Sequence, residues 1–125
     1  MKITGFCPLI VTRDAAAAVK VFEDLGFRKY HTKTDIEAGR NISYALKDGN
    51  GNRINITSSE TIQKDLTGIS VNVDHFQEAY DFLIARGFFN PRGDRITDTD
   101  SSIATLLFSP SGFAVSISEH IRRGE

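Results

Sequence analysis

The chain has 125 residues and a formal net charge of −1, with 15 Lys and Arg residues against 16 Asp and Glu residues. This length suits one compact domain with a hydrophobic core, and the interspersed charges exclude the basic field that binds nucleic acid. One cysteine excludes an internal disulfide, and no apolar stretch has the length of a signal peptide or a membrane span. We therefore expect a cytoplasmic protein without nucleic-acid or membrane partners.

The first half of the chain predicts a strand, a helix and three further strands. The apolar run from Phe6 to Thr12 has the length of a strand. Asp14 can cap a helix, because its carboxylate can accept hydrogen bonds from the first free amides. Apolar residues recur at helical spacing from Ala18 to Leu25, and Gly26 can supply the left-handed residue that ends a helix. The further strands are predicted at residues 27–32, 41–47 and 53–58.

The segment from Asp48 to Asn52 predicts a tight turn between the last two of these strands. It begins like a calcium-binding loop, but Arg53 replaces the required glycine and Ser59 replaces the closing glutamate. A hairpin turn is the better interpretation.

The second half repeats this order after a linker at residues 59–66. Apolar and polar residues alternate from Ile69 to Val73, as in a strand with one face on the core. A helix is predicted to begin at Asp74 or His75 and to end at Gly87, and a long polar loop extends from Asn90 to Ser101. The closing strands are predicted at residues 102–108 and 113–118.

The two halves match without a gap when one is moved 61 positions along the other, as Gly26 and Gly87 illustrate. The matches include both Gly-Phe pairs after the helices, as well as Gly51 and Gly112 in the turns before the last strands. Such a fixed register between special positions indicates a duplicated supersecondary unit. Because two copies are too few for a solenoid, we expect the halves to face each other across a concave groove.

Alternation assigns the faces of the last strands. The apolar members, expected under the helices, are Ile54, Ile56, Val115 and Ile117. The polar members, expected on the opposite face, are Asn55, Thr57, Ser116 and Ser118. Four equivalent polar positions are consistent with a wetted binding wall or with ordinary solvent-facing residues.

Two segments resemble the vicinal oxygen chelate superfamily of glyoxalases, bleomycin-resistance proteins and extradiol dioxygenases. They are Asp14 with the stretch Phe22–Phe27, and the stretch Phe108–Val115 with its Ser-Pro-Ser-Gly turn. The resemblance implies an α+β fold of two βαβββ modules with a concave groove. It also implies a single domain over residues 1–125, built of repeats at about 1–59 and 62–120. Homodimerisation is implied in the same way.

Enzymes of this superfamily usually hold a divalent metal at one position on the first and one on the last strand of each half. The matching positions here are Cys7, Asn55, Ser116 and either Gly68 or Thr67. None is a histidine or a carboxylate, and Asn or Ser alone displaces the hydration shell of a metal poorly. The resemblance therefore implies a metal-free branch, and we expect no metal or other cofactor.

The metal-free members of the superfamily that this chain resembles sequester small molecules. We therefore expect a small-molecule-binding protein, for drug or metabolite sequestration, rather than an enzyme. The residues expected to line its groove are Cys7, Leu9, Tyr44, Asn55, Thr57, Ser70, Asn72, Ser116 and Ser118.

Two enzymatic alternatives stay open. One is a glyoxalase-like lyase, isomerase or dioxygenase with a non-standard active site. The other is a metal-independent isomerase or lyase that uses Cys7, Tyr44 or Glu119. Glu119 and His120 resemble an acid–base pair, but adjacent strand residues point to opposite faces, which favours a solvated chain end.

Arginines form a further group of candidates. Arg40, Arg53 and Arg95 could grip an anionic ligand, although scattered surface arginines are the ordinary case.

Overall fold

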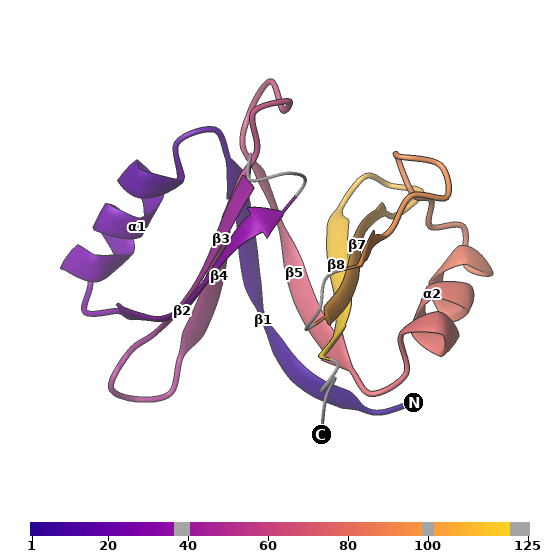
Figure 1. The fold of residues 1–125 in the computed structure, drawn as a ribbon, viewed down its shortest axis with the longest axis horizontal. Helices are drawn as coiled ribbons and strands as arrows, with labels where there is room; N and C mark the ends of the chain where they lie inside the picture. The colour runs from indigo at the N-terminus through magenta and orange to yellow at the C-terminus, as the bar shows by residue number, and fades with distance from the viewer. Residues whose placement is uncertain (37–40, 99–101, 121–125) are drawn as a thin grey trace. The chain divides into compact units, whose positions relative to one another are not determined.

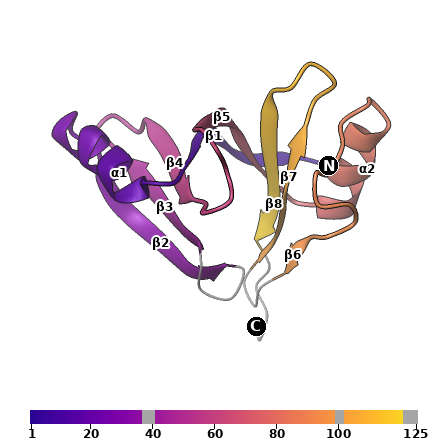
Figure 2. The same cartoon turned by 90° about the horizontal axis from the view of Figure 1, so that it is seen from above.

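The computed structural model describes residues 1–36, 41–98 and 102–120. The chain forms two compact units. We call Cys7–Thr67 the N-terminal unit, and Met1–Phe6 together with the described residues from Gly68 onward the C-terminal unit. Each unit contains one helix packed on one face of a sheet, as Figures 1 and 2 show.

The N-terminal unit contains a four-stranded sheet in the order β2-β3-β4-β1. Its strands are β1 (Ile3–Thr12), β2 (Arg28–Ile36), β3 (Asn41–Lys47) and β4 (Arg53–Ser58). Strand β3 is antiparallel to both β2 and β4, whereas β1 is parallel to β4 with Leu9 opposite Asn55. The bounds of β3 and β4 agree with those predicted from the sequence.

Helix α1 (Ala15–Asp24) begins and ends as its sequence predicts. The Asp14 carboxylate accepts a hydrogen bond from the Ala17 amide at 3.1 Å. At the other end Gly26 adopts a φ of 109°, which a side chain would strain. The buried core beneath the helix is formed by Ala15, Val19, Leu46, Ile54 and Ile56.

The C-terminal unit contains the second set of strands. These are β5 (Leu66–Val73), β6 (Thr97–Asp98), β7 (Ser102–Phe108) and β8 (Ala114–His120), in the order β5-β8-β7-β6. Strand β5 is parallel to β8, and the other two pairs are antiparallel. The first residues of β1 belong to this unit, where the Asp74 amide donates to the Lys2 carbonyl at 3.1 Å.

Helix α2 (Phe76–Ile84) begins differently from α1. His75 occupies the N-cap position but makes no side-chain cap hydrogen bond. The Phe76 amide instead donates to Glu119 Oε1 at 2.7 Å, so a carboxylate from β8 caps the helix. The buried core beneath α2 is formed by Val73, Phe76, Ala79, Leu107, Val115 and Ile117.

The two hairpin turns are built alike around one oxygen-bearing side chain. Asp48 Oδ1 accepts from the amides of Asn50 and Asn52, both at 2.9 Å. Ser109 Oγ accepts from the amides of Gly112 and Phe113, both at 3.0 Å. The segment that begins like a calcium loop is therefore a hairpin turn, and its Asp48 carboxylate accepts hydrogen bonds from the backbone of the turn itself.

The predicted assignment of faces is confirmed. Ile54 and Ile56 pack under α1, and Val115 and Ile117 pack under α2. Because neighbouring residues of a strand point to opposite faces, Asn55, Thr57, Ser116 and Ser118 lie on the other side. We call the sheet face opposite the helix the helix-free face of each unit.

Several predicted boundaries differ from the structure: β2 continues to Ile36 instead of ending at residue 32, and β5 begins at Leu66, inside the predicted linker. Strand β1 begins at Ile3 rather than Phe6, and β8 continues to His120 rather than ending at Ser118 as a solvated chain end would. The predicted loop from Asn90 contains the two-residue strand β6, which is too short to produce an alternating pattern. Among the described residues, neither helix has the length and apolar character needed to cross a membrane.

Candidate ligand-binding face

The helix-free face of the N-terminal unit gathers side chains from four strands. Residues opposite each other in a sheet point to the same side, so the strand register identifies them. The members fixed by the register are Leu9 and Val11 of β1, Arg28, His31 and Lys33 of β2, Ser43, Ala45 and Lys47 of β3, and Arg53, Asn55 and Thr57 of β4. Cys7 lies two residues before Leu9 on β1 and so faces the same way.

Polar residues of β4 lie beside a buried apolar strip on β1. Leu9 and Val11 are only 5% and 8% exposed. Asn55 and Thr57 are half-buried beside them, and Thr57 shares a hydrogen bond of 3.0 Å with Ser43. Of the residues expected to line a groove, Cys7, Leu9, Asn55 and Thr57 therefore lie on one face of this unit.

Cys7 is a half-buried thiol on this face. Burial raises its pKa above the ordinary value, although the positive charge of Arg53 and a hydrogen bond from the Asn55 backbone act in the opposite direction. The thiol is therefore protonated near neutral pH, which makes it a poor nucleophile and a weak metal ligand.

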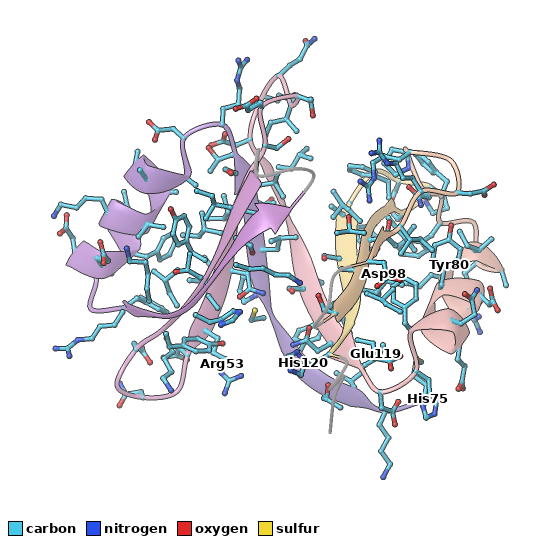
Figure 3. All side chains as sticks on the ribbon, viewed as in Figure 1. Arg53, His75, Tyr80, Asp98, Glu119 and His120 are labelled. Carbon is cyan, nitrogen blue, oxygen red and sulfur yellow. The ribbon has the colours of Figure 1, made fainter. Side chains whose placement is uncertain are left out.

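An aromatic ring holds two cations on the same face. Tyr30 is two residues after Arg28 on β2 and so faces the same way, and its ring lies beside residues of the β3–β4 hairpin. Lys47 Nζ lies 4.9 Å from the centre of the ring, and the Arg53 guanidinium carbon lies 5.7 Å from it. Figure 3 labels Arg53 on its strand. Sequence analysis singled out Arg53 but missed Tyr30 and Lys47.

Tyr44 lies on the opposite face from the one predicted. It is paired with Ile56 across β3 and β4, and it packs against the core beneath α1. Lys29 Nζ lies 5.4 Å from the centre of its ring. Tyr44 is therefore a residue of the helix side and is not part of the candidate face.

The C-terminal unit has an equivalent helix-free face with hydroxyl and amide groups. Ser70 is paired with Ser116, and Asn72 is paired with Ser118. The Ser118 hydroxyl donates a hydrogen bond to Asn72 Oδ1. Ser70 is buried and Ser116 is half-buried. All four expected residues of this unit therefore share one face.

A pocket of about 480 Å³ lies on the helix side of the C-terminal unit. It is lined by Phe76, Gln77, Asp94, Ile96, Asp98, Ile103 and Glu119, and Figure 3 labels Asp98 and Glu119 in this region. Because one Glu119 oxygen already caps α2, this carboxylate has a structural role there. Sequence analysis did not predict the pocket.

The four positions that correspond to metal ligands do not fit a divalent ion. A Cβ atom at Gly68 would lie 2.3 Å from the Ala114 carbonyl oxygen, so no side chain can be placed there without moving β8. Cys7 favours its protonated form, and Asn55, Ser116 and the alternative Thr67 supply only neutral oxygens. Within residues 1–36, 41–98 and 102–120, no group of three His, Cys, Asp or Glu side chains is arranged to hold a metal.

The enzymatic candidates among the sequence predictions are separated in the structure. Cys7 is on a helix-free face, whereas Tyr44 is on the helix side of the same unit. Glu119 is on the helix side of the C-terminal unit, where its partner is the Phe76 amide. Arg40 lies outside the described residues.

No protein-family model and no curated protein matches the sequence. Solved structures do match. A glyoxalase/bleomycin resistance protein/dioxygenase superfamily member from Vibrio splendidus 12B01 has a TM-score of 0.59 at 12% identity, covering 94% of this chain and 99% of that chain. The methylmalonyl-CoA epimerase from Mycobacterium tuberculosis has a TM-score of 0.69 at 13% identity, covering 97% of this chain and 91% of that chain.

A third solved structure is similar over almost the whole chain. The NAD-dependent benzaldehyde dehydrogenase from Legionella pneumophila has a TM-score of 0.63 at 12% identity, covering 94% of this chain and 100% of that chain. The chain thus has the α+β fold of the glyoxalase/bleomycin resistance protein/dioxygenase superfamily, with its repeated βαβββ module. Identities this low establish the fold and not the function.

Proposed function

We propose that the protein binds a small molecule on the helix-free face of its N-terminal unit without the help of a divalent metal. The observation that carries the proposal is the combination of half-buried polar groups and an apolar strip on this one face. Asn55, Thr57 and Cys7 supply half-buried hydrogen-bonding groups, and the buried side chains of Leu9 and Val11 form the apolar strip beside them. Ligand sites in proteins usually combine a mostly apolar lining with a few fixed polar groups.

The equivalent face of the C-terminal unit is proposed as a second ligand-contacting surface. Its hydroxyl and amide groups, from Ser70, Asn72, Ser116 and Ser118, lie in register on β5 and β8. We also propose a cytoplasmic homodimer, in keeping with the resemblance of the sequence motifs. Sedimentation at micromolar protein concentration checks the dimer, and a monomer there would contradict it.

Binding rather than metal-assisted catalysis is proposed because of the donor set. Gly68 has no room for a ligating side chain, and the other three positions offer a protonated thiol, an amide and a hydroxyl. We expect purified protein to contain less than about one-tenth equivalent of nickel, zinc, iron or manganese. Stoichiometric metal that is lost on substituting Cys7 or Asn55 would contradict this proposal and favour a glyoxalase-like enzyme.

Nuclear magnetic resonance tests the binding proposal directly, since amide signals report the position of a ligand even when it binds weakly. Small aromatic molecules of different charge should shift the amide signals of Cys7, Asn55 and Thr57 as they are titrated. Asn55→Leu and Ser116→Leu remove a hydrogen-bonding group and add bulk on the two faces. Each should weaken binding to its own face about tenfold or more, because an unpaired buried polar group costs about 1–3 kcal/mol.

The matched control is Ile56→Ala, on the same strand as Asn55 but on the helix side. It should lower stability while leaving ligand affinity nearly unchanged, because Ile56 is fully buried beneath α1. If the two leucine variants lower stability and leave affinity unchanged, the polar faces are structural and the proposal is wrong.

A further inference from the structure

We infer that the ligand of the N-terminal unit is an anion, whose carboxylate or phosphate group is held by Arg53 and Lys47 beside Tyr30. This inference rests on the proposed function and specifies the chemical class of the ligand. It differs from the cationic or neutral ligand that a generic drug-sequestering protein would accept. Four steps support it.

The first step is the sign of the charge on the face. Four cationic residues, Arg28, Lys33, Lys47 and Arg53, are placed on the helix-free face by the register of β2, β3 and β4. None of the described residues paired in register on this face is acidic. A face with one sign of charge attracts ligands of the opposite sign and repels organic cations.

The second step is the way two of these cations are held. Both Lys47 and Arg53 lie within 6 Å of the Tyr30 ring centre, at 4.9 and 5.7 Å. Contact with the negative face of an aromatic ring holds a long cationic side chain in place without consuming its hydrogen-bond donors. Among the described residues, neither cation forms an ion pair with a carboxylate. Their donors therefore remain available to an anion.

The third step is the geometry of recognition. A guanidinium group presents two parallel N–H donors, which match the two oxygens of a carboxylate or phosphate. Lys47 is directly opposite Arg53 across the β3–β4 hairpin. Its ammonium group can therefore add a third donor beside the two N–H donors of the guanidinium group. One anionic group can thus be bound by both side chains.

The fourth step connects the cations to the proposed ligand site. Arg53 is two residues before Asn55 on the same face of β4. Its charge also acts on the Cys7 thiol, which accepts a hydrogen bond from the Asn55 backbone. An anion at Arg53 would therefore place the remainder of the molecule along Asn55 and the apolar strip formed by Leu9 and Val11.

The experiment uses three probes with one apolar body and different charges. They are 4-phenylbutyrate, 4-phenyl-1-butanol and 4-phenylbutylamine, and phenyl phosphate is added to distinguish phosphate from carboxylate binding. Each is titrated into the isotope-labelled full-length protein, and dissociation constants are taken from the amide signals of Cys7, Asn55 and Thr57. We expect at least one anion to bind about tenfold or more tightly than the amine, as a charge-assisted pair predicts. Higher salt should weaken only anion binding.

Two variants and a matched control locate the effect. Arg53→Gln and Lys47→Gln should each weaken binding of the preferred anion about tenfold, with less than about a twofold change for the alcohol. Lys29→Gln is the control, because it removes the same charge and a similar contact with a tyrosine ring, but on the helix side. It should leave anion affinity unchanged. Melting temperatures identify any variant that fails to fold.

The outcomes separate this inference from the proposed function. If all probes shift the Asn55 signal with similar affinity, or Arg53→Gln leaves anion affinity unchanged, the face binds ligands but the anion inference is wrong. An equal loss for Lys29→Gln also overturns it, because net charge would then explain the preference. If no probe of any charge shifts Cys7, Asn55 or Thr57, the proposed function fails and the inference fails with it.

Discussion

The N-terminal and C-terminal units share a backbone plan but differ in the side chains of their helix-free faces. Arg28, Lys47 and Arg53 of the first unit correspond to Phe89, Phe108 and Ala114 of the second in the 61-residue repeat. Each set is brought together by its own strand pairing, since Arg28 is opposite Lys47 and Phe89 forms a bridge with Phe108. Two of these positions therefore hold cations in one unit and aromatic rings in the other, while the third holds a cation in one unit and an alanine in the other.

The helix starts differ in a comparable way. Asp14 caps α1 from within its own turn, whereas α2 is capped by Glu119 from the end of β8. Glycines with positive φ are kept at Gly26 and Gly87, and again at Gly51 and Gly112. The two units thus share the glycines that fix the backbone, whereas the positions free of that constraint differ in chemistry.

The largest expected effect tests whether the two cores are equivalent. Ile56 and Ile117 occupy matching positions and are 0% and 1% exposed. Ile56→Ala and Ile117→Ala should each lower the free energy of unfolding by about 2–5 kcal/mol, because each leaves a cavity in a packed core. Chemical denaturation measures the loss. A loss in only one of the variants would show that the two cores do not contribute equally.

The second prediction concerns the matching positions Cys7 and Gly68. Gly68→Ala should destabilise the protein by about 1–3 kcal/mol, because the new methyl group would lie 2.3 Å from the Ala114 carbonyl oxygen unless the backbone shifts. Cys7→Ala should cost less than about 1 kcal/mol, since the thiol is only half-buried. Thermal unfolding compares the two, and equal stabilities would contradict the close approach at Gly68.

The third prediction compares the two helix caps. Asp14→Ala and Glu119→Ala should each cost about 1 kcal/mol, because each leaves an amide of the first helical turn without its partner. Hydrogen exchange should locate the two losses separately. Asp14→Ala should increase exchange in α1, whereas Glu119→Ala should increase it in α2 and at the end of β8. Increased exchange confined to β8 would contradict the capping role of Glu119.

The smallest expected effect is a difference in pH dependence between the turn at Asp48 and the turn at Ser109. Hydrogen bonds, chiefly from the Asn52 side chain, hold the pKa of Asp48 below its usual value of 3.8. A lowered pKa in the folded state means that the stabilisation is present above pH 3.8 and is lost as the pH falls through the folded value. Acidification should therefore shift the amide signals of Asn50 and Asn52. The turn at Ser109 has a hydroxyl in place of the carboxylate, so the signals of Gly112 and Phe113 serve as the control.

Local patterns were sufficient to predict most of the backbone. Alternation along β4 and β8 placed Ile56 and Asn55 on the correct faces, and the glycines after each helix fixed the repeat register. Tyr44 was misplaced even though Ile42, Tyr44 and Leu46 alternate with smaller or polar residues on β3. The pattern that could have placed Tyr44 on the helix side was therefore present in the sequence.

Other features depend on contacts that no local pattern encodes. The hydrogen bond from Phe76 to Glu119 joins residues 43 positions apart. The shift in register between Lys29 and His31 places His31 opposite Ala45 on the helix-free face, and nothing in the residues of β2 indicates it. The contacts of Lys47 and Arg53 with the Tyr30 ring join side chains from three strands, so the proposed anion site could be found only in the structure.

The division of β1 between the two units has a consequence for synthesis of the chain. Met1–Phe6 belong to the unit that otherwise begins at Gly68, so this unit is discontinuous in sequence. During translation, every residue of Cys7–Thr67 is available before the strands from Gly68 onward have been made. The first six residues must therefore wait unpaired, and a fragment that starts at Gly68 would expose the edge of β5 that Ile3–Phe6 cover in the full chain.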